Sequence, residues 1–155
     1  MSHGVGPTNP QRENVRMGDS CVFCAIASGD APAFLLYEDE HAVAFLDIAP
    51  VRRGHTLVAP RRHVADVMAS GGAAAWTDVA LAVQTASRVL MARLGSDGIS
   101  LFQANRRAAG QEVWHLHMHL VPRRGGDERL VRWERSEVER GRLATTYGEL
   151  QQHTP

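Results

Sequence analysis

The sequence predicts an α+β fold: an antiparallel five-stranded sheet with one long helix and a short N-terminal helix. Five short segments have the alternating or continuous apolar pattern of strands, and a single segment has a sustained helical period. Most connections between the strand segments are too short for the crossovers of a parallel sheet, which favours antiparallel pairing. The chain has 155 residues, of which 44% are hydrophobic, and this suits one compact core.

The elements follow in a simple order. A short helix at 21–27 stops at Ser28-Gly29, and Pro32 prevents its continuation. The long helix is predicted at 73–94 and stopped by Gly95. The residues that recur along its apolar face are Trp76, Val79 or Ala80, Val83, Ser87, Leu90 and Leu94. Strands are expected at 35–38, 41–47, 55–59, 99–103 and 113–121, with Pro60 ending the third.

The two ends of the chain lack these patterns. Residues 1–19 mix Gly, Pro, Asn and Arg, and we interpret them as a flexible leader. The charges of residues 127–155 are nearly balanced, which favours a tail packing on the domain over an arm that binds nucleic acid. No apolar run approaches the roughly 18 residues of a membrane span, so we expect a cytoplasmic protein with no membrane partner.

The net charge and the residue composition exclude some binding surfaces and some reaction mechanisms. The formal net charge is zero, which argues against a broad surface for nucleic acid or polyphosphate. All 17 basic side chains are Arg, so Schiff-base and lysyl-nucleotidyl mechanisms are excluded. The eight histidines are then the conspicuous reactive groups.

Three of these histidines alternate with apolar residues in Trp114-His115-Leu116-His117-Met118-His119-Leu120. In a strand, the imidazoles share one face and the apolar side chains occupy the other. Such a row either binds a metal or transfers protons and acts as a nucleophile. The small residues of Ala108-Ala109-Gly110-Gln111 just before it let backbone N–H groups approach an anion. The combination suggests phosphoryl or nucleotidyl transfer.

The segment 109–123 resembles the signature of the histidine-triad family. The resemblance continues in family order through 21–24, 45–50 and 53–63, and it extends over about 21–124. It is closest to the zinc-containing, bacterial-type branch of nucleotide hydrolases. The resemblance implies that residues 20–126 form the catalytic domain and that two copies form a homodimer.

By this resemblance, His117 is the nucleophile that attacks the α-phosphorus and becomes nucleotidylated before water releases the product. His119 lies near the scissile phosphate, where it can donate a proton and bind substrate. His55 matches the family's upstream histidine, which also lies close to the phosphates.

The resemblance also implies a nucleotide pocket. Phe45 and Ile48 would line the base, and Asp47 would accept hydrogen bonds from the ribose. The backbone around Gly110 and the side chain of Gln111 would hold phosphate oxygens. Two departures occur here: Arg106 replaces the glycine expected after Asn105, a predicted phosphate or sugar contact, and Glu112 stands where some members carry Ser or Thr.

Zinc-bearing members of the family use four ligands that match Cys21, Cys24, His63 and His115 in this chain. Two thiolates and two imidazoles suit a closed, tetrahedral, structural Zn²⁺ site. On this interpretation His115 serves the metal rather than the chemistry. The Cys-x-x-Cys spacing alone leaves a redox pair or a simple buried pair open.

The expected function is therefore a hydrolase that cleaves at the α-phosphorus of a purine nucleotide derivative, adenosine-based by resemblance. A phosphoramidate, an adenylate and a dinucleoside polyphosphate all remain candidate substrates. Two other functions stay open: a non-enzymatic nucleotide-binding module, and a metal-dependent hydrolase that chelates its ion through the His-x-His-x-His strand. The second of these has no clear carboxylate partner beside that strand.

Overall fold

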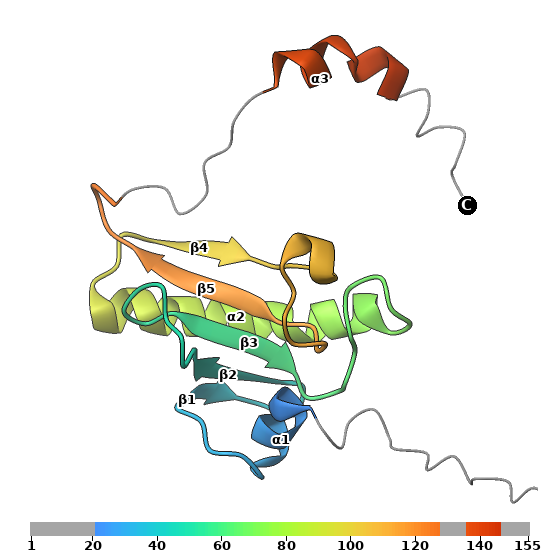
Figure 1. Cartoon of the computed structure of the whole chain (residues 1–155). Coiled ribbons are helices and arrows are strands. Elements are labelled where there is room, and N and C mark those ends of the chain that lie inside the picture. Colours follow the sequence, from blue (N-terminus) through green and yellow to red (C-terminus); the bar gives the residue numbers. More distant parts are fainter. Residues whose placement is uncertain (1–20, 128–135, 147–155) are drawn as a thin grey trace, which may run out of the picture. The chain divides into compact units, whose positions relative to one another are not determined.

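The computed structural model describes residues 21–127 and 136–146 (Figure 1). The chain divides into two units after Gly125. The first contains α1 (Val22–Ser28), β1 (Leu35–Glu38), β2 (Ala42–Leu46), β3 (Thr56–Pro60), α2 (Gly72–Leu94), β4 (Gly98–Phe102), the 3-10 turn η1 (Arg107–Ala109) and β5 (Met118–Arg123). The second contains α3 (Glu137–Gly141). The predicted leader and much of the predicted tail lie outside the described residues, so both interpretations stay predictions.

The five strands form one antiparallel sheet in the order β1-β2-β3-β5-β4, which confirms the predicted fold class. β5 lies between β3 and β4, so that His119 is paired with Leu57 on one side and Phe102 on the other. The C-terminal strand, which carries the third histidine of the triad, therefore lies inside the sheet.

Both faces of the sheet are covered, because successive side chains of a strand point to opposite sides. Ala42 and Ala44 of β2 belong to a core cluster with α2, whereas Val43 and Phe45 pack with α1. Figure 1 shows α2 lying along one face and α1 on the other. The burial of residues 42–45 of β2 and of all of β3 follows from this arrangement.

Helix α2 begins and ends close to the predicted residues, but its buried face differs from the predicted stripe. Its buried residues are Gly72, Ala75, Val79, Ala82, Ala86 and Leu90. Trp76, predicted to face the core, is 37% exposed. Small side chains let the helix approach the sheet closely, and the larger ones are displaced to its flanks. The sequence pattern was therefore right for Val79 and Leu90, but it favoured large side chains and missed the small ones that face the sheet.

The predicted strand at 113–121 is wrong at its start, since β5 begins at Met118. The N–H of Leu116 donates to the carbonyl of Val64, a loop residue, at 2.7 Å instead of joining a strand ladder. The predicted end of the third strand is also wrong, because Pro60 belongs to β3 and pairs with Ala42. The pairing of β3 with β5 stops at Val58, so the missing N–H of Pro60 costs that ladder no bond.

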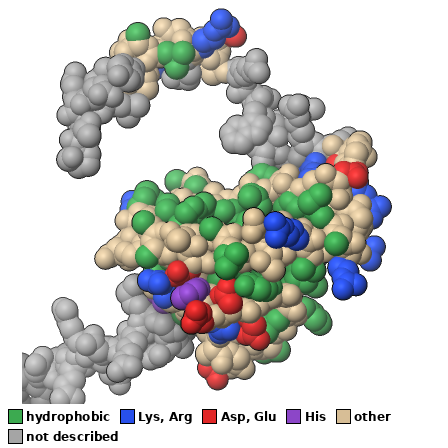
Figure 2. All heavy atoms as spheres, turned by 180° about the vertical axis from the view of Figure 1, so that it is seen from behind, with side chains coloured by type: hydrophobic (Ala, Val, Ile, Leu, Met, Phe, Trp, Pro, Cys, Tyr) green, Lys and Arg blue, Asp and Glu red, His purple; other side chains and the backbone are tan. Residues whose placement is uncertain are grey.

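The surface of the described part of the chain has no wide region of one charge on the face shown in Figure 2. Apolar side chains gather across its centre with a basic group among them, and most of the acidic side chains lie toward one end beside a histidine. None of the helices described has both the length and the apolar content needed to cross a bilayer.

Candidate active site

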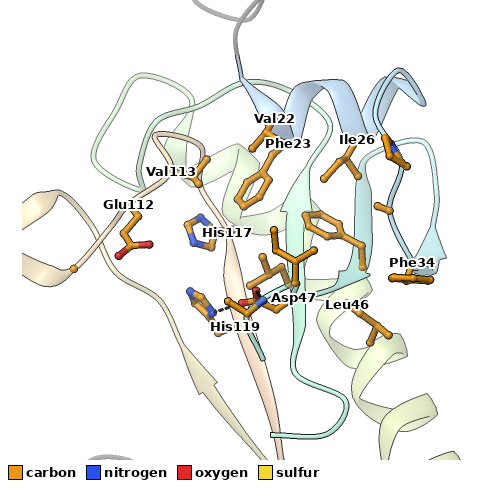
Figure 3. Close-up of a pocket in the computed structure, with 17 residues that line it drawn as sticks. Val22, Phe23, Ile26, Phe34, Leu46, Asp47, Glu112, Val113, His117 and His119 are labelled. Atoms are coloured by element: carbon orange, nitrogen blue, oxygen red, sulfur yellow. Dashed lines mark hydrogen bonds and ion pairs between the residues drawn. The ribbon is translucent and has the colours of Figure 1, made fainter. Parts of the chain in front are cut away.

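A cavity of about 670 Å³ lies on the α1 side of the sheet (Figure 3). Its apolar wall comes from α1, β2, β3 and the neighbouring loops, and includes Val22, Phe23, Ile26, Phe34, Phe45 and Leu57. Its polar lining consists of His117 and His119 of the triad together with Asp47 and Glu112. A largely apolar cavity of this size with a few convergent polar groups suits a small organic ligand.

His117 is held in one tautomer by the backbone. Its Nδ1 lies 2.7 Å from the carbonyl oxygen of His115, and a carbonyl can only accept. The proton of a neutral His117 is therefore on Nδ1, which leaves the lone pair on Nε2. Burial lowers the pKa of His117, and this favours the neutral ring. The arrangement is that of an imidazole prepared to act as a nucleophile.

His55 and His119 form a hydrogen-bonded pair in which each neutral ring carries its proton on Nε2, whereas His117 carries its proton on Nδ1. The N–H of Val51 donates to His55 Nδ1 at 3.3 Å, so the proton of His55 is on Nε2. That Nε2–H lies 2.9 Å from His119 Nδ1 and donates to it. The proton of His119 is then on its own Nε2, where it can be given to a ligand. His55, which was predicted to be catalytic, does not line the cavity, and its hydrogen bond to His119 connects it to a residue that does.

Asp47 provides negative charge beside this pair. Its Oδ1 accepts from the N–H of Ala49 at 2.8 Å, and its Oδ2 lies 3.5 Å from His55 Nδ1 and 4.0 Å from His119 Nδ1. Burial lowers the pKa of His55, and the Asp47 carboxylate opposes this effect. The expectation that no carboxylate lies beside the histidine strand is therefore wrong, because Asp47, the residue directly after β2, lies next to it.

Lowering the pH from 7 to 5 is expected to destabilise the protein partly through His119. Burial, and then the neighbouring His117 and His55 rings, lower the pKa of His119 to about 4, whereas an unfolded imidazole titrates near pH 6.5. As the pH falls, the unfolded state binds the proton first, so stability present above pH 6.5 is lost toward pH 4. For this partly exposed group the loss from pH 7 to pH 5 is about 1 to 2 kcal/mol.

Urea denaturation of wild type and His119→Gln at the two pH values measures this contribution. The other titrating groups are common to both proteins. Between pH 7 and pH 5, the free energy of unfolding of the variant should therefore fall by about 1 to 2 kcal/mol less than that of wild type. His41→Gln, which removes an imidazole that is 55% exposed, is the control and should behave as wild type. An equal loss of unfolding free energy in His119→Gln and wild type would show that the pKa of His119 is not lowered in the folded state.

The structure divides the residues predicted to contact substrate into two groups. Phe45, Asp47, Ile48 and Gly110 line the cavity, as do His117 and His119. Gln111 and Asn105 do not, and their amides hold the surrounding loops. Gln111, 4% exposed, donates from Nε2 to the carbonyls of Ala65 at 2.6 Å and Val113 at 3.0 Å. Asn105 Oδ1 accepts from the N–H of Val67 at 3.1 Å. Their direct contact with substrate stays a prediction.

Sequence reasoning missed the contribution of α1 to the cavity. Phe23 contacts Phe45 edge-to-face at 5.3 Å and His117 at 5.1 Å, measured between ring centroids. Ile26 and Val22 of the same helix line the cavity. The available signal was the apolar content between and after the two cysteines, which marks a packed segment but does not separate a core from a pocket wall.

A second group of side chains joins α1 to the loops after β3 and before β5. The Sγ of Cys24 lies 3.3 Å from His63 Nδ1 and 3.5 Å from His115 Nδ1, and the Sγ of Cys21 lies 3.4 Å from His115 Nδ1. The four ligand atoms are all within 4.8 Å of one another. Tetrahedral zinc bonds of about 2.3 Å to sulfur and about 2.0 Å to nitrogen would place these atoms about 3.5 Å apart. The geometry is compatible with Zn²⁺.

The surroundings of this zinc cluster (Cys21, Cys24, His63 and His115) also fit a metal. The Nε2 of buried His115 lies 2.8 Å from the carbonyl oxygen of Pro60 and donates to it, so its Nδ1 lone pair faces the thiols. Such a second hydrogen bond typically orients a metal-bound histidine. Burial, and then the Cys21 thiol, raise the pKa of Cys24 to about 11, a protonated state that a bound dication would reverse.

The three triad imidazoles do not converge on one metal position among the described residues. His115 belongs to the zinc cluster, and His119 belongs to a separate group with Asp47 and His55. His117 belongs to neither group. This arrangement gives no support to a catalytic ion held by the His-x-His-x-His segment itself.

Comparison with known proteins agrees with this geometry. Residues 28–126 match the family model of the HIT domain. Adenylylsulfatase HINT3 of Arabidopsis thaliana is 35% identical over 118 residues, which are 74% of this chain and 58% of that protein. The crystal structure of SMU.412c from Streptococcus mutans has a TM-score of 0.77 and 36% identity, covering 98% of this chain and 96% of that one. A Zn-bound histidine triad family protein from Mycobacterium smegmatis has a TM-score of 0.64 and 39% identity, covering 88% and 99%.

The family model spans more than half of the chain and includes the cavity histidines, the Asp47 segment and two of the four zinc-cluster residues. The fold, the order of the motifs and the sequence identity all lead to the same assignment. The chain belongs to the HIT, or histidine triad, family.

Proposed function

We propose that this protein hydrolyses an adenosine nucleotide derivative at its α-phosphorus through a nucleotidyl-His117 intermediate. The observation that carries the proposal is the 2.7 Å bond from His117 Nδ1–H to the His115 carbonyl, which leaves the Nε2 lone pair for attack. Membership of the HIT family and similarity to an adenylylsulfatase support nucleotide hydrolysis as the class of reaction.

The proposed reaction has two displacements. His117 Nε2 attacks phosphorus, an N–P bond forms, and the bond from phosphorus to the leaving group breaks. His119 gives its Nε2 proton to the leaving group. Water then attacks the nucleotidyl phosphorus, the N–P bond breaks, and the water proton returns to His119. Proton transfers of this kind typically contribute about 10²- to 10⁴-fold to the rate.

The remaining parts of the site suit an adenosine nucleotide. The apolar wall around Phe45 and Phe23 accommodates a base, and Asp47 accepts hydrogen bonds from ribose hydroxyls. Backbone N–H groups near Gly110, which also lines the cavity, stabilise charge on the phosphate oxygens. A structural Zn²⁺ held by the zinc cluster would fasten α1 to the segment that carries His117. We further expect a cytoplasmic homodimer.

The proposal is tested by trapping the intermediate. Wild type is mixed with an adenosine phosphoramidate, quenched within one turnover, and analysed by intact-mass and peptide mass spectrometry at alkaline pH, where a phosphohistidine bond survives. Adenylate on the peptide that contains His117, which disappears at later times, is the expected result. Normal turnover with no labelled residue 117 would exclude the intermediate.

The second candidate function is a non-enzymatic nucleotide-binding module. Its support is the same largely apolar cavity, which suits a small organic ligand whether or not chemistry follows. Wild type that binds adenosine monophosphate but turns over no phosphoramidate, adenylate or dinucleoside polyphosphate would favour this module.

A further inference from the structure

The charge of the cavity lining is unusual for a protein that handles a phosphate ester. Among the described residues that line it, Asp47 and Glu112 carry full charges and both are acidic. No Arg lines the cavity, and the chain has no Lys. A substrate with several negative charges therefore meets no permanent cation on this wall.

Glu112 lies at a distinct end of the cavity. Figure 3 shows it beside His117 and away from Phe34 and Leu46, which belong to the apolar end. With the nucleoside in the apolar end and the phosphorus at His117, the part of the cavity left for the other substituent on phosphorus includes Glu112 in its lining. The two acidic residues therefore face different parts of the substrate.

Glu112 is also free to act on a ligand. Asp47 accepts a hydrogen bond from the N–H of Ala49 at 2.8 Å. The carboxylate of Glu112, in contrast, makes no hydrogen bond or ion pair with another described residue. Its side chain is exposed at the cavity wall, so it is not required for packing. A carboxylate in this position attracts cations and repels anions at the place where the leaving group departs.

We propose that Glu112 determines leaving-group specificity: it favours substrates whose leaving group carries a positive charge and disfavours polyphosphate leaving groups. This inference rests on the proposed function and narrows its substrate to phosphoramidates or adenylates with a cationic amine. The reaction is unchanged: the P–N or P–O bond breaks, His117 takes the nucleotidyl group, and the leaving group takes a proton. Glu112 contributes only its charge.

The test compares three substrates in wild type and Glu112→Gln. They are adenosine phosphoramidates of butylamine and of 1,4-diaminobutane, which differ by one ammonium group, and diadenosine triphosphate. The ratio of kcat/KM for the diamine substrate to that for the triphosphate should fall about five- to tenfold in the variant, since an exposed carboxylate acts on the two charges in opposite directions. Added salt should reduce this ratio in wild type and leave the variant nearly unchanged.

Glu40→Gln removes a carboxylate whose side chain is 85% exposed and which lies outside the cavity lining, and it should keep the wild-type ratio. An unchanged ratio in Glu112→Gln, or a wild-type preference for diadenosine triphosphate, would overturn the inference and leave the proposed hydrolysis intact. Absence of turnover on all three substrates in wild type would instead overturn the proposed function, and this inference with it.

Discussion

His117→Ala is expected to lower kcat for an adenosine phosphoramidate by at least about 10⁴-fold, the scale seen when a covalent nucleophile is removed. The cavity wall around the nucleoside is unchanged in this variant, so the Kd for adenosine monophosphate should stay within a few-fold of wild type. Steady-state kinetics and isothermal titration calorimetry measure the two quantities. The contrast between lost turnover and retained binding separates a chemical role from a binding role.

His117 is buried, so the alanine variant must be shown to fold before its activity is interpreted. Thermal unfolding followed by circular dichroism provides that check, and His117→Gln, which fills more of the space, should be equally inactive. His41→Ala, which removes an exposed imidazole, should retain full activity. Turnover by folded His117→Ala within tenfold of wild type would mean that water attacks the phosphorus directly.

Much of the fold follows from local sequence patterns, because alternation and helical periodicity depend on neighbouring residues only. The α2 boundaries and the apolar side of the triad segment, with Leu116, Met118 and Leu120 in the core, are examples. The start of β5 was not predictable in this way. It is determined by the bond between Leu116 and Val64, which lie far apart in the chain.

The site was predictable to a smaller extent. The triad alternation indicated imidazole chemistry, but the separation of His115 from His117 depends on contacts with Cys21 and Cys24, more than 90 residues away. The family resemblance, rather than spacing, identified those partners. Gln111 was predicted as a phosphate ligand by the family resemblance. Its actual partners are backbone groups of folded loops, which no local pattern reveals.

Cys24→Ser is expected to abolish zinc binding and to lower the free energy of unfolding by about 3 kcal/mol or more, the range for loss of a structural metal. Cys24 is the appropriate choice because its Sγ contacts both His63 and His115. Its loss would release α1, whose Phe23 packs against His117. Where the variant is still folded, kcat should fall about 10- to 100-fold, less than in His117→Ala, because the cluster positions the nucleophile without touching substrate.

Metal analysis and denaturation with and without a chelator distinguish zinc from the alternatives for the two cysteines. Wild type should contain about one zinc per chain, lose stability on chelation and regain it with added zinc, while Cys24→Ser should respond to neither treatment. If the two cysteines instead form a redox pair, a thiol reductant should change the free energy of unfolding of wild type, because it would break a Cys21–Cys24 disulfide. A simple buried pair would respond to neither reagent. Wild-type stability that is insensitive to chelator, in protein free of zinc, would exclude the metal. The attachment of α1 would then rest on apolar packing, in which Phe23 contacts both Phe45 and the His117 ring.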